Sequence, residues 1–268
     1  AYRLISISIP NITPHYGFYM KIHQLKTRLV NSNIVEYRDK LLVMDVAIGC
    51  HNEVLHFIEN RLNRRAEEID LVLCSHDDPD HMGGIEALAK AGKAGVAVPY
   101  ASGSTLKKLY NDPSGKIFRL ATSMVEATRV RAWKMYLNPK RSKAARQRLG
   151  AFKPHVLEQY NEAVLHKIEH YSMKHEEAVP GFDDWQVIHT PGHSWDSCCF
   201  FHKGSGSLIT GDTLLGSGKK GHLVKPSIYA NPLHLQRSMR QLKRLPINAV
   251  YPGHGSVMQG GNLLDHLL

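Results

Sequence analysis

Four short polar motifs, each directly after an apolar segment, constrain the fold of this sequence most. The first is SHDDPDH from Ser75, which follows the segment IDLVLC. The others are TPGHS from Thr190, TGDT from Thr210 and PGHG from Pro252. Short apolar segments bounded by turn residues predict strands, and the end of a strand presents the next side chains at the edge of a sheet. The pattern predicts imidazoles and carboxylates from four distant segments gathered in one cleft.

Strands and helices alternate along the body of the chain. Apolar residues at helical spacing predict helices over 54–66, 83–91 and 231–245. Apolar or β-branched segments predict strands over 4–9, 34–37, 41–46, 69–74, 96–98, 185–188, 198–202, 207–209 and 249–251. This alternation indicates an α/β protein built in layers around a core.

The segment from about 102 to 178 differs from the rest. Apolar residues recur every three or four positions between Pro154 and Glu177, which predicts an amphipathic helix ending in that region. The chain has a formal net charge of +10, and residues 116–153 alone hold eleven Lys or Arg against one acid, Glu126. We interpret 102–178 as a helical, basic insertion, a lid or cap, within a single domain that spans residues 1–268.

The four motifs together predict a metal site, although none of them does so alone. A single histidine or a Pro-Gly turn after a strand is common in proteins that bind no ligand. Neutral imidazole and carboxylate are ligands that bind divalent metals tightly, and here both recur in order at four strand ends. Strand ends hold such donors rigidly, and the adjacent glycines let backbone and substrate approach.

In their order these motifs resemble those of the metallo-β-lactamase superfamily: H-x-[HD]-x-D-H, T-P-G-H-S, T-G-D-T and P-G-H-G. The resemblance covers nearly the whole body of the chain, with the insertion between the first two motifs, where members of the superfamily vary. It implies an αββα sandwich with a two-metal site at one edge of the paired sheets.

The resemblance also implies which side chains bind the metal ions. It implies three ligands for one ion, three for the second and one bridge: His76, Asp78 and His193; Asp80, His81 and His254; and Asp212. Asp80 would also act as the catalytic residue that orients the attacking water or transfers its proton. Two such ions, roughly 3.5–4 Å apart, make a hydroxide available at neutral pH and polarise a carbonyl or phosphoryl oxygen.

Asp78 departs from the commonest form of the first motif, H-x-H-x-D-H, which has a second histidine there. A carboxylate can ligate in its place, and similar H-x-D-x-D-H members of the superfamily exist. The added negative charge weakens the first ion as a Lewis acid and favours harder ions. We therefore expect two divalent ions, zinc first, with iron or manganese as the alternatives.

Four other residues are candidates for substrate binding. Lys219 and His222 lie in a glycine-rich segment after TGDT. In the glutathione-thioester hydrolases of the superfamily, the corresponding loop holds acidic substrate groups; a solvated loop without a ligand is the alternative here. His15 and Tyr19 follow the first predicted strand, where they would line the cleft.

The leading hypothesis is a metal-dependent hydrolase of a small, anionic ester, thioester or lactone held under the insertion. A diiron, oxygen-reactive protein of the same fold is one alternative. A metal-dependent nuclease or phosphodiesterase, with nucleic acid on the basic insertion, is another. The insertion could instead be a plain solvated face or a contact in a homodimer. The intact ligand set argues against a binding protein without turnover.

Cysteine usage and hydropathy bear on location. The chain contains no stretch of roughly 20 apolar residues and no basic segment followed by an apolar core, so we expect neither a membrane span nor a secretory signal. Its four cysteines are too few and too irregularly spaced for a disulfide framework. These features predict buried thiols and a cytoplasmic protein.

Overall fold

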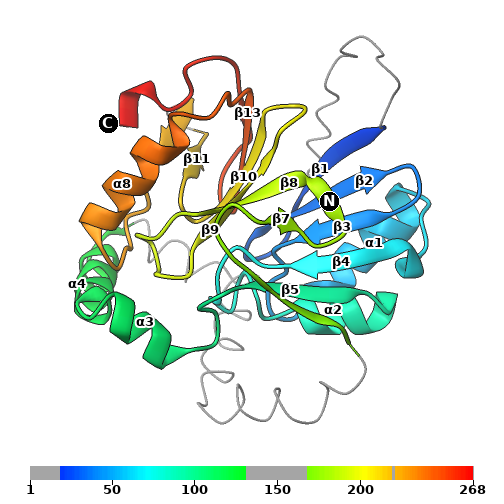
Figure 1. Ribbon diagram of the computed structural model, residues 1–268, viewed down its shortest axis with the longest axis horizontal. Helices are drawn as coiled ribbons and strands as arrows, with labels where there is room; N and C mark the ends of the chain where they lie inside the picture. The colour runs from blue at the N-terminus through cyan, green and yellow to red at the C-terminus, as the bar shows by residue number, and fades with distance from the viewer. Residues whose placement is uncertain (1–18, 131–167, 219–220, 268) are drawn as a thin grey trace.

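The computed structural model describes residues 19–130, 168–218 and 221–267 (Figure 1). The strand expected over 4–9, residues 131–167 of the basic insertion, His15 and Lys219 lie outside these residues. None of the helices in the described ranges is long and apolar enough to cross a bilayer.

The first sheet has six strands in the order of the sequence. These are β1 (Met20–Lys26), β2 (Asn31–Tyr37), β3 (Leu41–Met44), β4 (Ile69–Leu73), β5 (Gly95–Pro99) and β6 (His170–Met173). The first three strands pair antiparallel, and β3 to β6 pair parallel. Parallel neighbours need crossover connections. In the described part of these connections lie the helices α1 (His51–Arg61), α2 (Ile85–Gly92), α3 (Thr105–Asn111) and α4 (Gly115–Ala127).

The second sheet also has six strands, in the order β14-β13-β10-β9-β8-β7. Its strands are β7 (Ala178–Val179), β8 (Phe182–His189), β9 (Cys198–His202), β10 (Ser207–Gly211), β13 (Ala249–Pro252) and β14 (Met258–Gln259). Only β10 and β13 pair parallel, and helix α8 (Pro232–Leu242) lies in the connection between them. A separate hairpin pairs β11 (Leu215–Ser217) with β12 (His222–Val224). The two 3-10 helices are η1 (Ala66–Glu68) and η2 (Asp265–Leu267).

Three apolar clusters join these elements into four layers. The central cluster lies between the sheets, and includes Leu71 of the first sheet and Phe200 of the second. A second cluster packs α1 and α2 on the outer face of the first sheet, and a third packs α8 on the outer face of the second (Figure 1). The order helix, sheet, sheet, helix confirms the expected α/β sandwich. Strand β4 is almost continuously apolar because both of its faces are covered.

The structure confirms most of the predicted elements and corrects three segments. The helix expected between Pro154 and Glu177 does not reach its predicted end, because His170–Met173 is strand β6, parallel to β5. Strand β1 was not predicted, since the segment MKIHQLK carries polar side chains that an edge strand tolerates. The glycine-rich segment expected as a loop contains the β11–β12 hairpin, which places His222 at the start of β12.

Candidate metal centre

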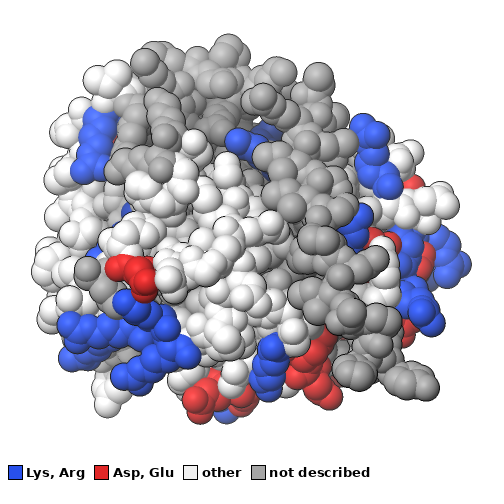
Figure 2. Space-filling model, turned by 90° about the horizontal axis from the view of Figure 1, so that it is seen from above, with Lys and Arg blue, Asp and Glu red and all other residues white. Residues whose placement is uncertain are grey.

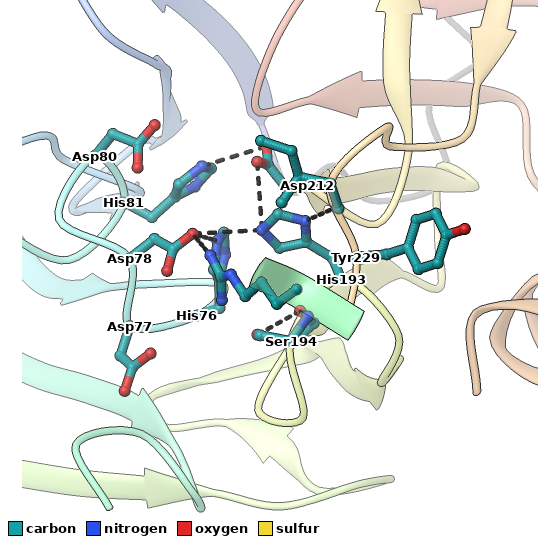
Figure 3. Close-up of polar contacts among 12 residues, drawn as sticks. His76, Asp77, Asp78, Asp80, His81, His193, Ser194, Asp212 and Tyr229 are labelled. Atoms are coloured by element: carbon teal, nitrogen blue, oxygen red, sulfur yellow. Dashed lines mark hydrogen bonds and ion pairs between the residues drawn. The ribbon is translucent and has the colours of Figure 1, made fainter. Parts of the chain in front are cut away.

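The four polar motifs meet at one edge of the paired sheets. Their donor side chains follow the carboxyl ends of β4, β8, β10 and β13. The two sheets are joined at this edge, where the Cys198 amide donates a hydrogen bond to the Ser75 carbonyl (2.9 Å). Figure 3 shows side chains from three of the four motifs pointing toward one another: His76, Asp78, His81, His193 and Asp212. The structure thus brings together the side chains that the sequence placed far apart.

A first group of donors comprises His76, Asp78 and His193, whose ligand atoms all lie within 4.8 Å of one another. The Nε2 atoms of His76 and His193 lie 3.3 and 3.4 Å from Asp78 Oδ2. Both imidazoles are buried, and the Asp78 side chain is one-fifth exposed. The carboxylate at position 78 therefore occupies the place that a second histidine would take in the commoner motif.

A second group comprises Asp80, His81 and His254, also within 4.8 Å. Asp212 lies between the two groups. Its Oδ1 atom is 3.3 Å from the Nε2 atoms of both His81 and His254, and its Oδ2 atom is 3.7 Å from His193 Nε2. One carboxylate thus faces both groups of donors with different oxygens. This is the arrangement that the resemblance implies for a bridging ligand.

Unpaired buried atoms test whether these residues fit a metal. Within the described residues, His76 Nε2, His81 Nε2 and Asp212 Oδ1 are buried and form no hydrogen bond. Buried polar atoms are nearly always paired, so three such atoms around one space need an explanation. A pair of divalent cations explains them, since the donors are imidazole nitrogens and carboxylate oxygens.

The opposite ring nitrogens are held by hydrogen bonds that orient the donors. His193 Nδ1 donates to the Ile228 carbonyl (2.8 Å), while His76 Nδ1 lies 3.0 Å from Ser75 Oγ. His81 Nδ1 lies 3.0 Å from Asp45 Oδ2. A proton held at Nδ1 leaves the Nε2 lone pair free for a metal, and such outer hydrogen bonds fix the ring orientation.

The sequence analysis missed Asp45, whose carboxylate contacts the predicted ligand His81. Asp45 is fully buried directly after β3 and has a positive φ of 62°. Its carboxylate accepts hydrogen bonds from the Ser75 amide (2.7 Å) and the Ser75 hydroxyl (3.0 Å), in addition to its contact with His81. A polar residue after an apolar strand was the signal used for the four motifs. Here that signal was lost because the predicted strand ran to residue 46.

Ser75 lies at the base of both groups of donors. Its hydroxyl oxygen contacts the Nδ1 atoms of His76 and His81 at 3.0 and 3.3 Å. Gly211, with a φ of +48°, packs against this hydroxyl so closely that a Cβ atom there would lie 2.1 Å from Ser75 Oγ. The glycine before Asp212 is therefore required for the two loops to touch.

Charge within the centre favours anionic carboxylates. Burial opposes the ionisation of Asp212, yet His254 and His81 hold the pKa of this carboxyl well below its usual range. Burial likewise opposes the ionisation of Asp78, while Arg119 and His76 hold its pKa well below the usual range. Both carboxylates are therefore ionised at neutral pH, as the binding of a cation requires.

Two basic side chains from the insertion reach the loop that carries the first motif. Lys108 of α3 forms ion pairs with Asp77 and with Asp196 Oδ1, the latter at 2.8 Å. Arg119 of α4 forms an ion pair with Asp78 Oδ2. Asp77 points away from the other donors in Figure 3, as expected from alternation along the loop. Sequence reasoning missed both basic residues, because no local pattern links a helix to an acid more than thirty residues away.

The rest of the basic segment is mostly outside the described residues. Of the eleven bases in 116–153, the structure describes Lys116, Arg119 and Arg129, and Arg129 pairs with Glu126 (2.8 Å). On the face shown in Figure 2, the described basic side chains form separate groups, several of them beside acids, with an uncharged area between them. The insertion's contacts with substrate, nucleic acid or a second copy of the chain stay predictions.

The other predicted substrate-binding residues lie outside the groups of donors. Tyr19 is half exposed at the start of the described chain. The His222 ring lies 4.7 Å from the ring of His266 in η2. Neither residue belongs to a cluster of possible metal ligands within the described ranges. Their role in substrate binding, like that of His15 and Lys219, stays a prediction.

A cavity of ≈ 460 Å³ opens between α4 and the β11–β12 hairpin. Its lining includes Val125 of α4 and Arg129 just after that helix, with Lys225 and Tyr229 across from them. Tyr229 directly follows Ile228, whose carbonyl holds His193. The cavity presents two cations and an aromatic ring, and one of its lining residues is the chain neighbour of the residue that holds His193.

Comparison with known proteins agrees with the family resemblance of the four motifs. The family model described as "Metallo-beta-lactamase superfamily" matches residues 25–254. The "Probable metallo-hydrolase YqjP" of Bacillus subtilis is 33% identical over 82 residues, 29% of this chain and 26% of that protein. An "Atrochrysone carboxyl ACP thioesterase" of Aspergillus fumigatus is 34% identical over 74 residues, 28% of this chain and 21% of that enzyme. The chain thus matches only about a quarter of the length of these relatives.

Solved structures share the fold at low sequence identity. A metallo-β-lactamase family protein from Thermus thermophilus is 21% identical and has a TM-score of 0.56, with 94% of this chain and 78% of that chain covered. The chemotaxis sensor ODP of T. denticola, in a peroxy diiron state, is 14% identical and also has a TM-score of 0.56. That match covers 92% of this chain and 90% of the sensor.

Proposed function

This chain belongs to the metallo-β-lactamase superfamily, and we propose that it is a hydrolase that uses two divalent metal ions, zinc first, on a small ester, thioester or lactone. One observation carries the proposal. Asp212 presents one oxygen to His81 and His254 and the other to His193, so that a single carboxylate connects two groups of donors. Such a bridge suits a pair of ions a few ångströms apart.

The proposed centre has the seven ligands that the sequence predicts. When bound, the ions would supply a hydroxide nucleophile at neutral pH and polarise the scissile carbonyl. Asp80 lies in the second group, with its Oδ2 atom 3.5 Å from His254 Nε2. From this position its carboxylate would orient the attacking water and hold the proton that the water releases.

The cavity between α4 and the β11–β12 hairpin supports a substrate with an anionic part. Arg129 and Lys225 line the cavity together with Val125 and the Tyr229 ring. Two cations attract a carboxylate or phosphate, while the apolar side chains accommodate an acyl or aromatic part. Thioesterases among the partial relatives agree with an acyl substrate. The free, buried state of all four cysteines agrees with the cytoplasmic location that we propose.

Hydrolysis of a substrate panel tests the proposal. We expect the zinc-loaded protein to cleave at least one thioester, ester or lactone, with a preference for anionic members over neutral analogues. Replacing Asp80 by asparagine should lower kcat by about 10²-fold or more, because the carboxylate no longer accepts a proton.

Asp77→Asn is a matched control on the same loop, because Asp77 points away from the donors and pairs with Lys108 instead. Equal turnover by Asp80→Asn and the unchanged chain would contradict the mechanism. Cleavage of phosphodiesters or nucleic acid alone would replace it with the nuclease alternative.

The diiron alternative is favoured by one feature, the carboxylate at Asp78. Carboxylate ligands suit iron as well as zinc. Protein purified without added metal should contain about two zinc ions per chain if it is a hydrolase. Two iron ions per chain with a visible absorption band, and no hydrolysis of the panel, would establish the oxygen-reactive function instead.

A further inference from the structure

The ion pair between Arg119 and Asp78 links the insertion to a ligand of the metal centre proposed above, on which this inference rests. Arg119 contacts Asp78 Oδ2, the same oxygen that lies 3.3 Å from His76 and 3.4 Å from His193. The guanidinium therefore lies at the donor atom itself. In contrast, Lys108 pairs with Asp77 and Asp196, which belong to neither group of donors.

Contacts on both sides of Arg119 fix the helix that carries it. Thr122, one turn further along α4, donates its hydroxyl to the Tyr229 carbonyl (3.0 Å) and accepts from the Tyr229 amide (3.1 Å). Just before α4, Asp112 accepts a hydrogen bond from Asn231 Nδ2 (3.0 Å). Asn231 also caps α8, so α4 is attached to the second sheet's helical layer. Arg119 therefore reaches Asp78 from a fixed support.

We propose that Arg119 is a charge-balancing partner of Asp78, and that the two side chains together replace the neutral histidine of the commoner motif. An aspartate alone at position 78 adds one negative charge to the ligands of the first ion, and the adjacent guanidinium cancels it. The pair thus leaves the net charge around that ion equal to the charge that a histidine would give. Arg119 acts through Asp78 and is a positioning residue rather than a ligand.

Among the described residues near Asp78, no cation other than Arg119 is free to balance the negative charge of this carboxylate. Lys108 is committed to two other acids, and the Arg119 side chain is about one-third exposed and directed to Asp78. A unit charge several ångströms away, at an effective dielectric constant near 20, changes a binding constant by about tenfold or more. Charge balance at this position is therefore large enough to measure.

The test measures zinc affinity by competition with a chromogenic chelator, and needs no hydrolytic activity. Asp78→His leaves Arg119 beside a neutral ligand, and we expect it to weaken the binding of the first zinc at least tenfold. Adding Arg119→Met to Asp78→His restores the original net charge, and we expect affinity within about threefold of the unchanged chain. Arg119→Met alone should bind zinc at least as tightly as the unchanged chain.

Lys116→Met is the matched control, since it removes a cation from the same helix without contact to a ligand in the described residues; we expect no change. The proposal fails if the double variant binds no more tightly than Asp78→His. It also fails if Arg119→Met alone weakens binding tenfold, which would show that Arg119 only holds Asp78 in place. Circular dichroism checks folding. Asp78→Asn keeps the size of the side chain at position 78. We expect it to bind zinc more weakly than the double variant that combines it with Arg119→Met.

Discussion

Two sides of the proposed metal centre, a floor and a helical wall, are built in different ways. The floor comprises Asp45 and Ser75, just after β3 and β4, and His81 in the loop that follows β4; all three are buried and joined by hydrogen bonds. The wall formed by α3 and α4 directs Lys108 and Arg119 inward, while its outer surface carries exposed apolar side chains such as Tyr110 and Ile117. The floor thus places the donors of the centre, and the helical wall adjusts its charge.

Asp45→Ala should have the largest effect, because it removes the carboxylate that holds Ser75 and His81. Buried donors would be left without acceptors, at a cost of about 3 to 5 kcal/mol in the free energy of unfolding. Zinc affinity should also fall by about 10- to 100-fold, as for other residues that orient a ligand.

Chemical denaturation and chelator competition measure these two quantities for Asp45→Ala. Asp70→Ala is a control in which the replaced carboxylate is half exposed on β4, and its effect on both quantities should be small. If Asp45→Ala changed the free energy of unfolding and the zinc affinity as little as Asp70→Ala does, the hydrogen bonds of Asp45 would not be what holds the donors in place.

Lys108→Met should have an intermediate effect that depends on pH. Burial opposes the ionisation of Asp196, but Lys108 and His76 lower its pKa to about 2. Because this pKa is depressed, the contribution of the ionised carboxylate to stability is complete above about pH 4, the usual Asp value, and is lost as the pH falls toward 2. Removing Lys108 should therefore cost about 2 kcal/mol at pH 7, and this cost should shrink between pH 4 and pH 2.

Urea unfolding of metal-free protein across that pH range measures the cost of Lys108→Met. Lys107→Met, in the same helix, removes a cation that lies over the Tyr100 ring rather than beside an acid, and should show no such pH dependence. A cost that stays constant from pH 7 to pH 2 would mean that Lys108 acts through packing, not through the charge of Asp196.

Tyr110→Ser should have the smallest effect. Its side chain is 87% exposed on α3, so its replacement removes little contact within the described structure. We expect a change of at most about 0.5 kcal/mol in the free energy of unfolding and no change in zinc affinity. A loss above about 1 kcal/mol in a thermal or chemical unfolding experiment would mean that the outer surface of the helical wall is packed against other parts of the chain.

The same contrast explains how much the sequence could predict. The positions of the donor residues follow a local rule, because an apolar strand followed by a polar turn places His76 or Asp212 at a sheet edge. Asp45 obeys the same rule, but its strand end was set two residues too late. Arg119 obeys no local rule, since its partner is an acid on another element. Strand β6 was mistaken for helix because Tyr171 continues the three- and four-residue spacing of apolar residues before it.

The contact between Gly211 and Ser75 also limits how this chain can vary. Any side chain at position 211 would displace the hydroxyl that two imidazoles share, so one substitution would disturb donors of both proposed ions. Asp78 and Arg119, in contrast, are both partly exposed to solvent. We therefore expect adaptation to a different metal to begin with substitutions of Asp78 and Arg119, because these leave the hydrogen bonds between Asp45, Ser75 and His81 unchanged.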